Sequence, residues 1–128
     1  IHRDPAETIP SICSLTSQVR KGFTDHTDLN ELGKKTLDFW ENSKQKNEAQ
    51  KNSLNNDQYM DIYYDDFIKS PLQTIEAIYA NFNFSFDEKI KGLVEFNIEK
   101  SVKRHKEKHI YTLEEYGLDK KEVHNRLQ

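Results

Sequence analysis

Arg3 and Ser11 are the residues whose types and spacing could hold a phosphate group. Arg3 stands directly before Asp4 and Pro5, a pair typical of a helix start. Ser11 follows eight residues later, about two turns along the same side of that helix. A guanidinium grips phosphate with two charged donors, a hydroxyl adds one neutral donor, and a helix N-terminus favours an anion. The alternative is a surface Arg3 that pairs with Asp4 or Glu7, with Ser11 merely tolerated in the helix.

The basic segment 100–109 is a second candidate for anion binding. It holds five Lys or Arg residues against one Glu, so it carries about +4 while the other residues carry about −7. Such a run is more often a solvated face. His105 and His109 have the spacing of two metal ligands on a helix, but no cysteine or third histidine lies near them, and we set a metal site aside. Because the chain is acidic overall and the segment lacks interleaved aromatic residues, we expect no nucleic-acid partner.

The composition limits the class of protein. The 128 residues suffice for at most one domain, and an aromatic share of 11% argues against disorder. A hydrophobic share of 34% is low for a self-contained core. No apolar run approaches the roughly 20 residues that cross a bilayer, so we expect no membrane segment in this stretch. The single cysteine, Cys13, excludes an internal disulfide and falls on an apolar helix face, where burial is expected.

Periodicity and capping residues predict several helices and one clear strand. One helix follows Asp4, and a long one runs from Leu29 to about Lys51. Residues 58–67 (QYMDIYYDDF) are expected to form the strand, since Tyr and Ile favour strands. Further helices are expected after Pro71, after Ser85, and as two short helices separated by Gly117. The residues expected to face inward are Ile9, Ile12, Cys13, Thr16, Val19, Leu32, Thr36, Phe39, Trp40, Leu72, Ile75, Ile78, Tyr79, Phe82, Ile90, Leu93, Val94 and Asn97.

A single strand cannot form a sheet, because its backbone groups need partners. Each expected helix also has an apolar face that needs something to pack against. Ile1 resembles the last residue of a buried strand that runs directly into the first helix. The pattern therefore predicts a piece of an α/β domain, predominantly helical over residues 1–128, with the rest of the domain before Ile1.

Two stretches resemble sulfotransferases, which use 3′-phosphoadenosine 5′-phosphosulfate (PAPS). HRDPAETIPSICSL (2–15) is similar to a family segment in which an Arg at a strand end and a Ser eight residues later contact the 3′-phosphate. These positions map to Arg3 and Ser11. YYDDFIKSP (63–71) is similar to a strand-to-helix segment whose leading tyrosine lies against the nucleotide, which maps to Tyr64. Asp65 here replaces the usual Glu and keeps the charge.

The C-terminal stretch carries the third resemblance. RHKEKHIYTLEEYGLD (104–119) resembles the end of a bacterial-type sulfotransferase subgroup, in which a basic loop precedes a Tyr-Ser-Leu-Glu-Asp-Phe-Gly-Leu pattern. In other sulfotransferases a basic loop closes over the 3′-phosphate. The resemblance implies that this loop binds the nucleotide through Arg104, Lys106 and Lys108, with Lys103 as a further candidate, and it leaves open which of the four contacts the 3′-phosphate.

The resemblance implies a P-loop-NTPase-like α/β fold in which residues 1–128 are the C-terminal portion of one domain. The phosphosulfate-binding loop and the general base of the family lie upstream of this portion and are not found in the 128 residues. We therefore expect no catalytic residue in this stretch and no activity from it alone. The implied partners are the missing N-terminal half and an acceptor hydroxyl or amine, with adenosine 3′,5′-bisphosphate as the product.

Three questions stay open at this point. The chain could be a helical interaction module without nucleotide chemistry, or a fragment of a P-loop nucleotide kinase. The acceptor could be a carbohydrate, a peptide tyrosine, a small alcohol or an amine. Nothing in the residues indicates the cellular compartment.

Overall fold

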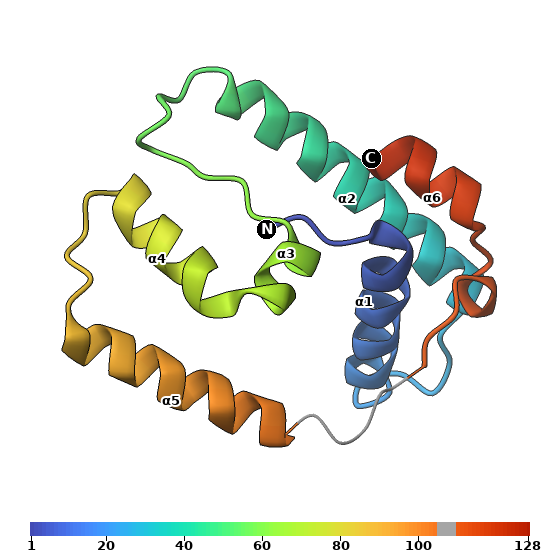
Figure 1. The fold of residues 1–128 in the computed structure, drawn as a ribbon. Coiled ribbons are helices and arrows are strands. Elements are labelled where there is room, and N and C mark those ends of the chain that lie inside the picture. The colour runs from blue at the N-terminus through green and yellow to red at the C-terminus, as the bar shows by residue number, and fades with distance from the viewer. Residues whose placement is uncertain (105–109) are drawn as a thin grey trace. The chain divides into compact units, whose positions relative to one another are not determined.

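A computed structural model describes residues 1–104 and 110–128, which form mainly helices joined by loops (Figure 1). They divide into two units. Unit 1 comprises Ile1–Arg3 and the described part of Leu54–His109, and unit 2 comprises Asp4–Ser53 and Ile110–Gln128. None of the described helices is long and apolar enough to span a bilayer. The expected site residues Lys106 and Lys108 lie outside the described residues, as do His105 and His109.

Unit 2 begins with α1 (Pro5–Arg20). The Asp4 carboxylate caps this helix by accepting the N–H of Ala6 at 2.8 Å, and Pro5 occupies the first position. The prediction of a helix start at this point is confirmed. Its buried residues include Ile9 and Cys13, both of which were expected to face inward.

The long helix α2 (Leu29–Lys51) has the predicted bounds. Asp28 caps it by accepting the N–H of Glu31 at 3.0 Å. Its buried residues are confined to 32–37, and the prediction that Phe39 and Trp40 face inward is wrong, because their exposed fractions are 64% and 41%. The two rings pack edge to face against each other, with centroids 5.8 Å apart, and neither belongs to the hydrophobic core.

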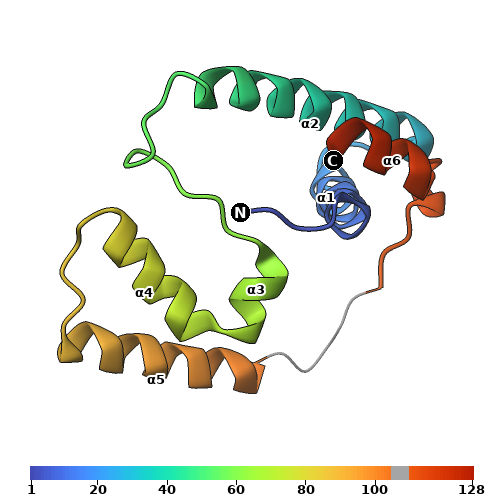
Figure 2. The same ribbon diagram turned by 45° about the horizontal axis from the view of Figure 1, so that its top comes forward.

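Two short elements complete unit 2. The 3₁₀-helix η1 (Glu114–Tyr116) ends at Gly117, whose φ of 66° is the left-handed conformation that glycine adopts at little cost. Asp119 then caps α6 (Lys120–Leu127) by accepting two backbone N–H groups. Figure 2 looks almost along α1 and shows α2 and α6 beside it. The hydrophobic core between them consists of Ile9, Cys13, Leu32, Leu37, Leu113, Tyr116, Leu118 and Val123.

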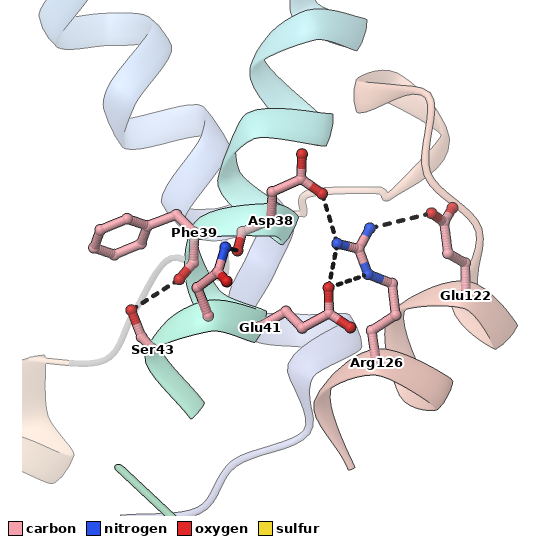
Figure 3. A network of polar contacts seen from close by, with 7 residues as sticks. Asp38, Phe39, Glu41, Ser43, Glu122 and Arg126 are labelled. Atoms are coloured by element: carbon pink, nitrogen blue, oxygen red, sulfur yellow. Dashed lines mark hydrogen bonds and ion pairs between the residues drawn. The ribbon is translucent and has the colours of Figure 1, made fainter. Parts of the chain in front are cut away.

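Arg126 fastens α6 to α2 (Figure 3). Its guanidinium lies 2.6 Å from a carboxylate oxygen of Asp38 and 2.6 Å from one of Glu41. A third carboxylate, that of Glu122, lies 3.5 Å away on α6 itself. The hydrogen bonds to Glu41 and then to Asp38 raise the pKa of Arg126, so the guanidinium stays charged throughout the working pH range.

In unit 1 the prediction of a strand over residues 58–67 is wrong. Only Tyr63 pairs, in a single parallel bridge with His2, and no longer strand forms among the described residues. The helix α3 (Tyr64–Lys69) begins at the next residue. The pairing partner extends over Ile1–Arg3 alone, which is too short for a ladder, and two aspartates in the first turn of α3 favour a helix start.

The remaining helices of unit 1 are α4 (Pro71–Asn81) and α5 (Glu88–Arg104), which lie side by side in both ribbon views. Pro71 stands at the first position of α4, as predicted. The α5 helix is capped by Asp87, which accepts the N–H of Ile90, rather than by Ser85 as expected. A largely apolar groove of about 420 Å³ runs between α3, α4 and α5, lined by Phe67, Ile75, Tyr79, Ile90, Leu93, Val94, Asn97, Ile98 and Ser101.

Candidate nucleotide-binding site

Arg3 and Tyr64 lie against each other in unit 1. The guanidinium carbon of Arg3 is 4.5 Å from the centroid of the Tyr64 ring, within the range of a cation–π interaction. The parallel bridge places them: the N–H of His2 donates to the carbonyl of Ile62 at 2.7 Å, and the N–H of Tyr64 donates to the carbonyl of His2 at 2.8 Å. Two residues 61 positions apart that the sequence assigned to one site are therefore brought together.

His2 secures this bridge on its other side. Its ring stacks on that of Tyr63 with centroids 5.0 Å apart, and its Nε2 lies 2.7 Å from Oδ1 of Asp61. Successive side chains of an extended segment point to opposite sides. Arg3 therefore lies on the face of this segment opposite to His2 and its partners. His2 thus has a packing and positioning role, and no local sequence pattern points to Asp61 as its partner.

Arg3 and Tyr64 offer two kinds of contact to a ligand. The Arg3 side chain is exposed and permanently charged, so it can bind a phosphate through two hydrogen bonds. The Tyr64 ring is half-buried and presents a flat apolar surface. A nucleotide carries both an anionic phosphate and a flat base or sugar face, so the pair suits that class of ligand.

The backbone N–H groups in the first turn of α1 already donate hydrogen bonds to Asp4. Pro5 has none, the N–H of Ala6 donates to the Asp4 carboxylate, and those of Glu7 and Thr8 donate to the Asp4 carbonyl at 3.1 Å. Binding of an anion near this end therefore depends on side chains rather than on free backbone donors. Ser11 lies on α1 within unit 2 and is half-buried.

The basic residues expected to close over the phosphate are described only in part. The backbone of Arg104 ends α5, while Lys106 and Lys108 lie outside the described residues. Of the residues assigned to the site, the described structure thus joins Arg3 to Tyr64, and it places Ser11 in the other unit.

A scan of known families matches residues 1–88 to the Sulfotransferase family. This match covers more than half of the chain, including Arg3, Ser11 and Tyr64. The chain belongs to the sulfotransferase family.

Among solved structures, the chain is similar to the crystal structure of sulfotransferase STF1 from Mycobacterium tuberculosis H37Rv. The TM-score is 0.77 at 24% sequence identity, and the similarity covers 98% of this chain. At that identity the likeness concerns the fold. The chain spans 31% of the length of the mycobacterial protein. A search of curated proteins gives no match.

Proposed function

We propose that the chain is the C-terminal part of a sulfotransferase domain with a P-loop-NTPase-like α/β fold, and that it binds the nucleotide end of PAPS. In this proposal the phosphosulfate loop and the general base belong to an N-terminal half of the same domain. The family match supports the reaction class, and the 31% share of the mycobacterial protein supports a larger domain. The acceptor is a molecule with a hydroxyl or amine group.

The contact between Arg3 and Tyr64 carries this proposal. The Arg3 guanidinium binds the 3′-phosphate, and Ser11 adds a neutral hydrogen bond. The face of the Tyr64 ring packs against the guanidinium. In this proposal the same ring also lies against the nucleoside. Arg104, Lys106 and Lys108 belong to the basic segment that closes over the same phosphate.

The contribution of these residues to the reaction is positioning. The acceptor oxygen or nitrogen attacks sulfur, its proton passes to a base in the N-terminal half, and the bond between sulfur and the 5′-phosphate oxygen breaks. Adenosine 3′,5′-bisphosphate leaves. Arg3 lies at the far end of the donor, where its binding energy holds the sulfuryl group in line for attack. The 128-residue chain alone is expected to give no sulfated product.

Calorimetric titration of adenosine 3′,5′-bisphosphate into the full-length protein tests the proposal, with 5′-AMP as the matched ligand that lacks the 3′-phosphate. Arg3→Ala is expected to weaken binding of the bisphosphate by about 10- to 100-fold, since a hydrogen-bonded charge pair contributes about 1.5–3 kcal/mol. Ser11→Ala is expected to cost less, because its hydrogen bond is neutral. Arg20→Ala, at the opposite end of α1, is the control and should leave binding unchanged.

Three results would count against the proposal. Equal binding of the two nucleotides by the unmodified protein would remove the 3′-phosphate site and favour an interaction module. Preference for a 5′-triphosphate would favour a nucleotide kinase. Unchanged affinity in Arg3→Ala would exclude Arg3 from the site.

A further inference from the structure

His124 on α6 contacts the residue that begins α1. Its Nε2 lies 2.8 Å from Oδ1 of Asp4, 120 positions away in the chain. The same oxygen accepts the N–H of Ala6 at 2.8 Å, so one atom of Asp4 both caps α1 and ties it to α6. The side chains of His124 and Asp4 are 26% and 39% exposed, so water screens the contact only in part.

The helix that carries His124 is itself anchored. Val123 is fully buried in the core of unit 2, and Arg126 binds Asp38 and Glu41 of α2. His124 lies between these two anchors on α6. Because α6 is anchored, His124 restrains the Asp4 carboxylate, and Asp4 does not restrain His124.

Asp4 places a negative charge directly after Arg3 in the chain. Burial acts to raise the pKa of Asp4, but the hydrogen bonds from His124 and then from Ala6 outweigh it, and the charge of Lys120 adds to them. The pKa lies below its ordinary value of 3.8. Asp4 is therefore a carboxylate at neutral pH, and an unrestrained carboxylate at this position would compete with a phosphate for Arg3.

We propose that His124 is a positioning residue for the 3′-phosphate site. It holds the Asp4 carboxylate on the first turn of α1, and thereby fixes the start of the helix that carries Ser11. The inference rests on the proposed function. His124 acts only through Asp4 and does not touch the nucleotide.

The test measures the dissociation constants of adenosine 3′,5′-bisphosphate and 5′-AMP with variants of the full-length protein. His124→Leu removes the donor and is expected to weaken bisphosphate binding roughly 3- to 10-fold, with 5′-AMP unchanged. Asparagine at this position is too short to reach Asp4, so His124→Asn should weaken binding to the same extent. It replaces His124→Leu in the test if the leucine variant does not fold. His124→Gln keeps a donor near the Nε2 position and should restore affinity to within about 2-fold.

Arg126→Met is the matched control, because it loosens α6 from α2 without removing the contact with Asp4. It should lower the melting temperature and leave the ratio of the two dissociation constants as in the unmodified protein, because Val123, next to His124, still anchors α6 in the core. An equal change of that ratio in Arg126→Met and His124→Leu would overturn the inference, since the effect would then be general docking of α6. An unchanged ratio in His124→Leu would overturn it directly.

A second measurement separates this inference from the proposed function. Exchange of the Ala6 amide hydrogen, followed by NMR without nucleotide, should be faster in His124→Leu because its acceptor is no longer held. Unchanged exchange would overturn the restraint even where the nucleotide results agree. Failure of the unmodified protein to distinguish the two nucleotides would overturn the proposed function, and with it the role of His124 at a phosphate site.

Discussion

Units 1 and 2 differ in how they hold their apolar side chains. In unit 2, eight apolar residues from α1, α2 and the C-terminal segment form a common buried core. In unit 1, none of the residues of α3 and α4 is fully buried, and Leu93 and Phe96 of α5 are 56% and 59% exposed. Both units have amphipathic helices, but only in unit 2 do segments from the two ends of the chain meet around one core.

This difference shows that unit 2 buries its apolar side chains by its own contacts, whereas unit 1 does not. The apolar spacing of α4 and α5 is as regular as that of α1, but residues expected to face inward, Leu93 among them, line an open groove instead of a closed interior. Under the proposed assignment, the N-terminal half of the sulfotransferase domain supplies the cover for this groove. Unit 2 would then be the self-sufficient part, and unit 1 the part completed by the larger domain.

The largest expected effect tests this contrast with one substitution in each unit. Leu37 of α2 is 0% exposed, so Leu37→Ala should destabilise unit 2 by about 2–5 kcal/mol through lost burial and a cavity. Leu93→Ala in α5 is the matched change and should stay within about 0.5 kcal/mol. Urea unfolding of the 128-residue chain, followed by Trp40 fluorescence for unit 2 and by circular dichroism for all helices, gives both values. Equal losses would break the comparison.

Two helical glycines provide a test of intermediate size. A Cβ at Gly33 would overlap the backbone carbonyl oxygen of Tyr116 and come 2.9 Å from its Cβ, so Gly33→Ala should cost about 1–3 kcal/mol. A Cβ at Gly92 of α5 meets nothing within 4 Å, so Gly92→Ala should stabilise its helix by about 0.5–1 kcal/mol. Thermal unfolding of the two variants should therefore shift in opposite directions. A loss in both would mean that α5 is closely covered.

The smallest expected effect depends on pH and belongs to unit 2. Because the pKa of Asp4 is lowered in the folded state, its stabilising effect is complete above the ordinary value of 3.8 and is lost as pH falls through the lower, folded-state value. Asp4→Asn keeps a capping side chain without the charge, and should cost less than about 1 kcal/mol at pH 7, since the carboxylate is more than a third exposed. The difference from the unmodified chain should shrink between pH 5 and pH 2, as measured by urea unfolding. A constant difference would show that the charge has no role.

Helix boundaries were predictable because local chemistry sets them. Asp4 with Pro5, Ser70 with Pro71, and Gly117 each act within a few residues of a helix end. Burial was less predictable, because it depends on which elements, distant in the sequence, pack against each side chain. Trp40 has the correct helical phase for the core, yet it is 41% exposed, although Arg126 and Gln128 contact Glu41 and Lys44 just beyond it on α2.

The candidate site was predictable only where its residues fall in contiguous motifs. The spacing of Arg3 and Ser11, and the position of Tyr64 in its motif, could be taken from short stretches. The contacts of His2 with Asp61 and of His124 with Asp4 join residues 59 and 120 positions apart, and no local pattern encodes them. The strand over 58–67 failed for a related reason: strand formation depends on the partner's length, which local propensity cannot express.

Cys13 makes transient opening of unit 2 measurable through the reactivity of its thiol. It is the sole cysteine of the chain, it is fully buried, and burial raises the pKa of its thiol. A folded unit 2 therefore keeps both the sulfur and its reactive thiolate form away from alkylating reagents. The rate of modification by such a reagent would follow the fraction of time that α1 separates from α2, without any label or substitution introduced into the protein.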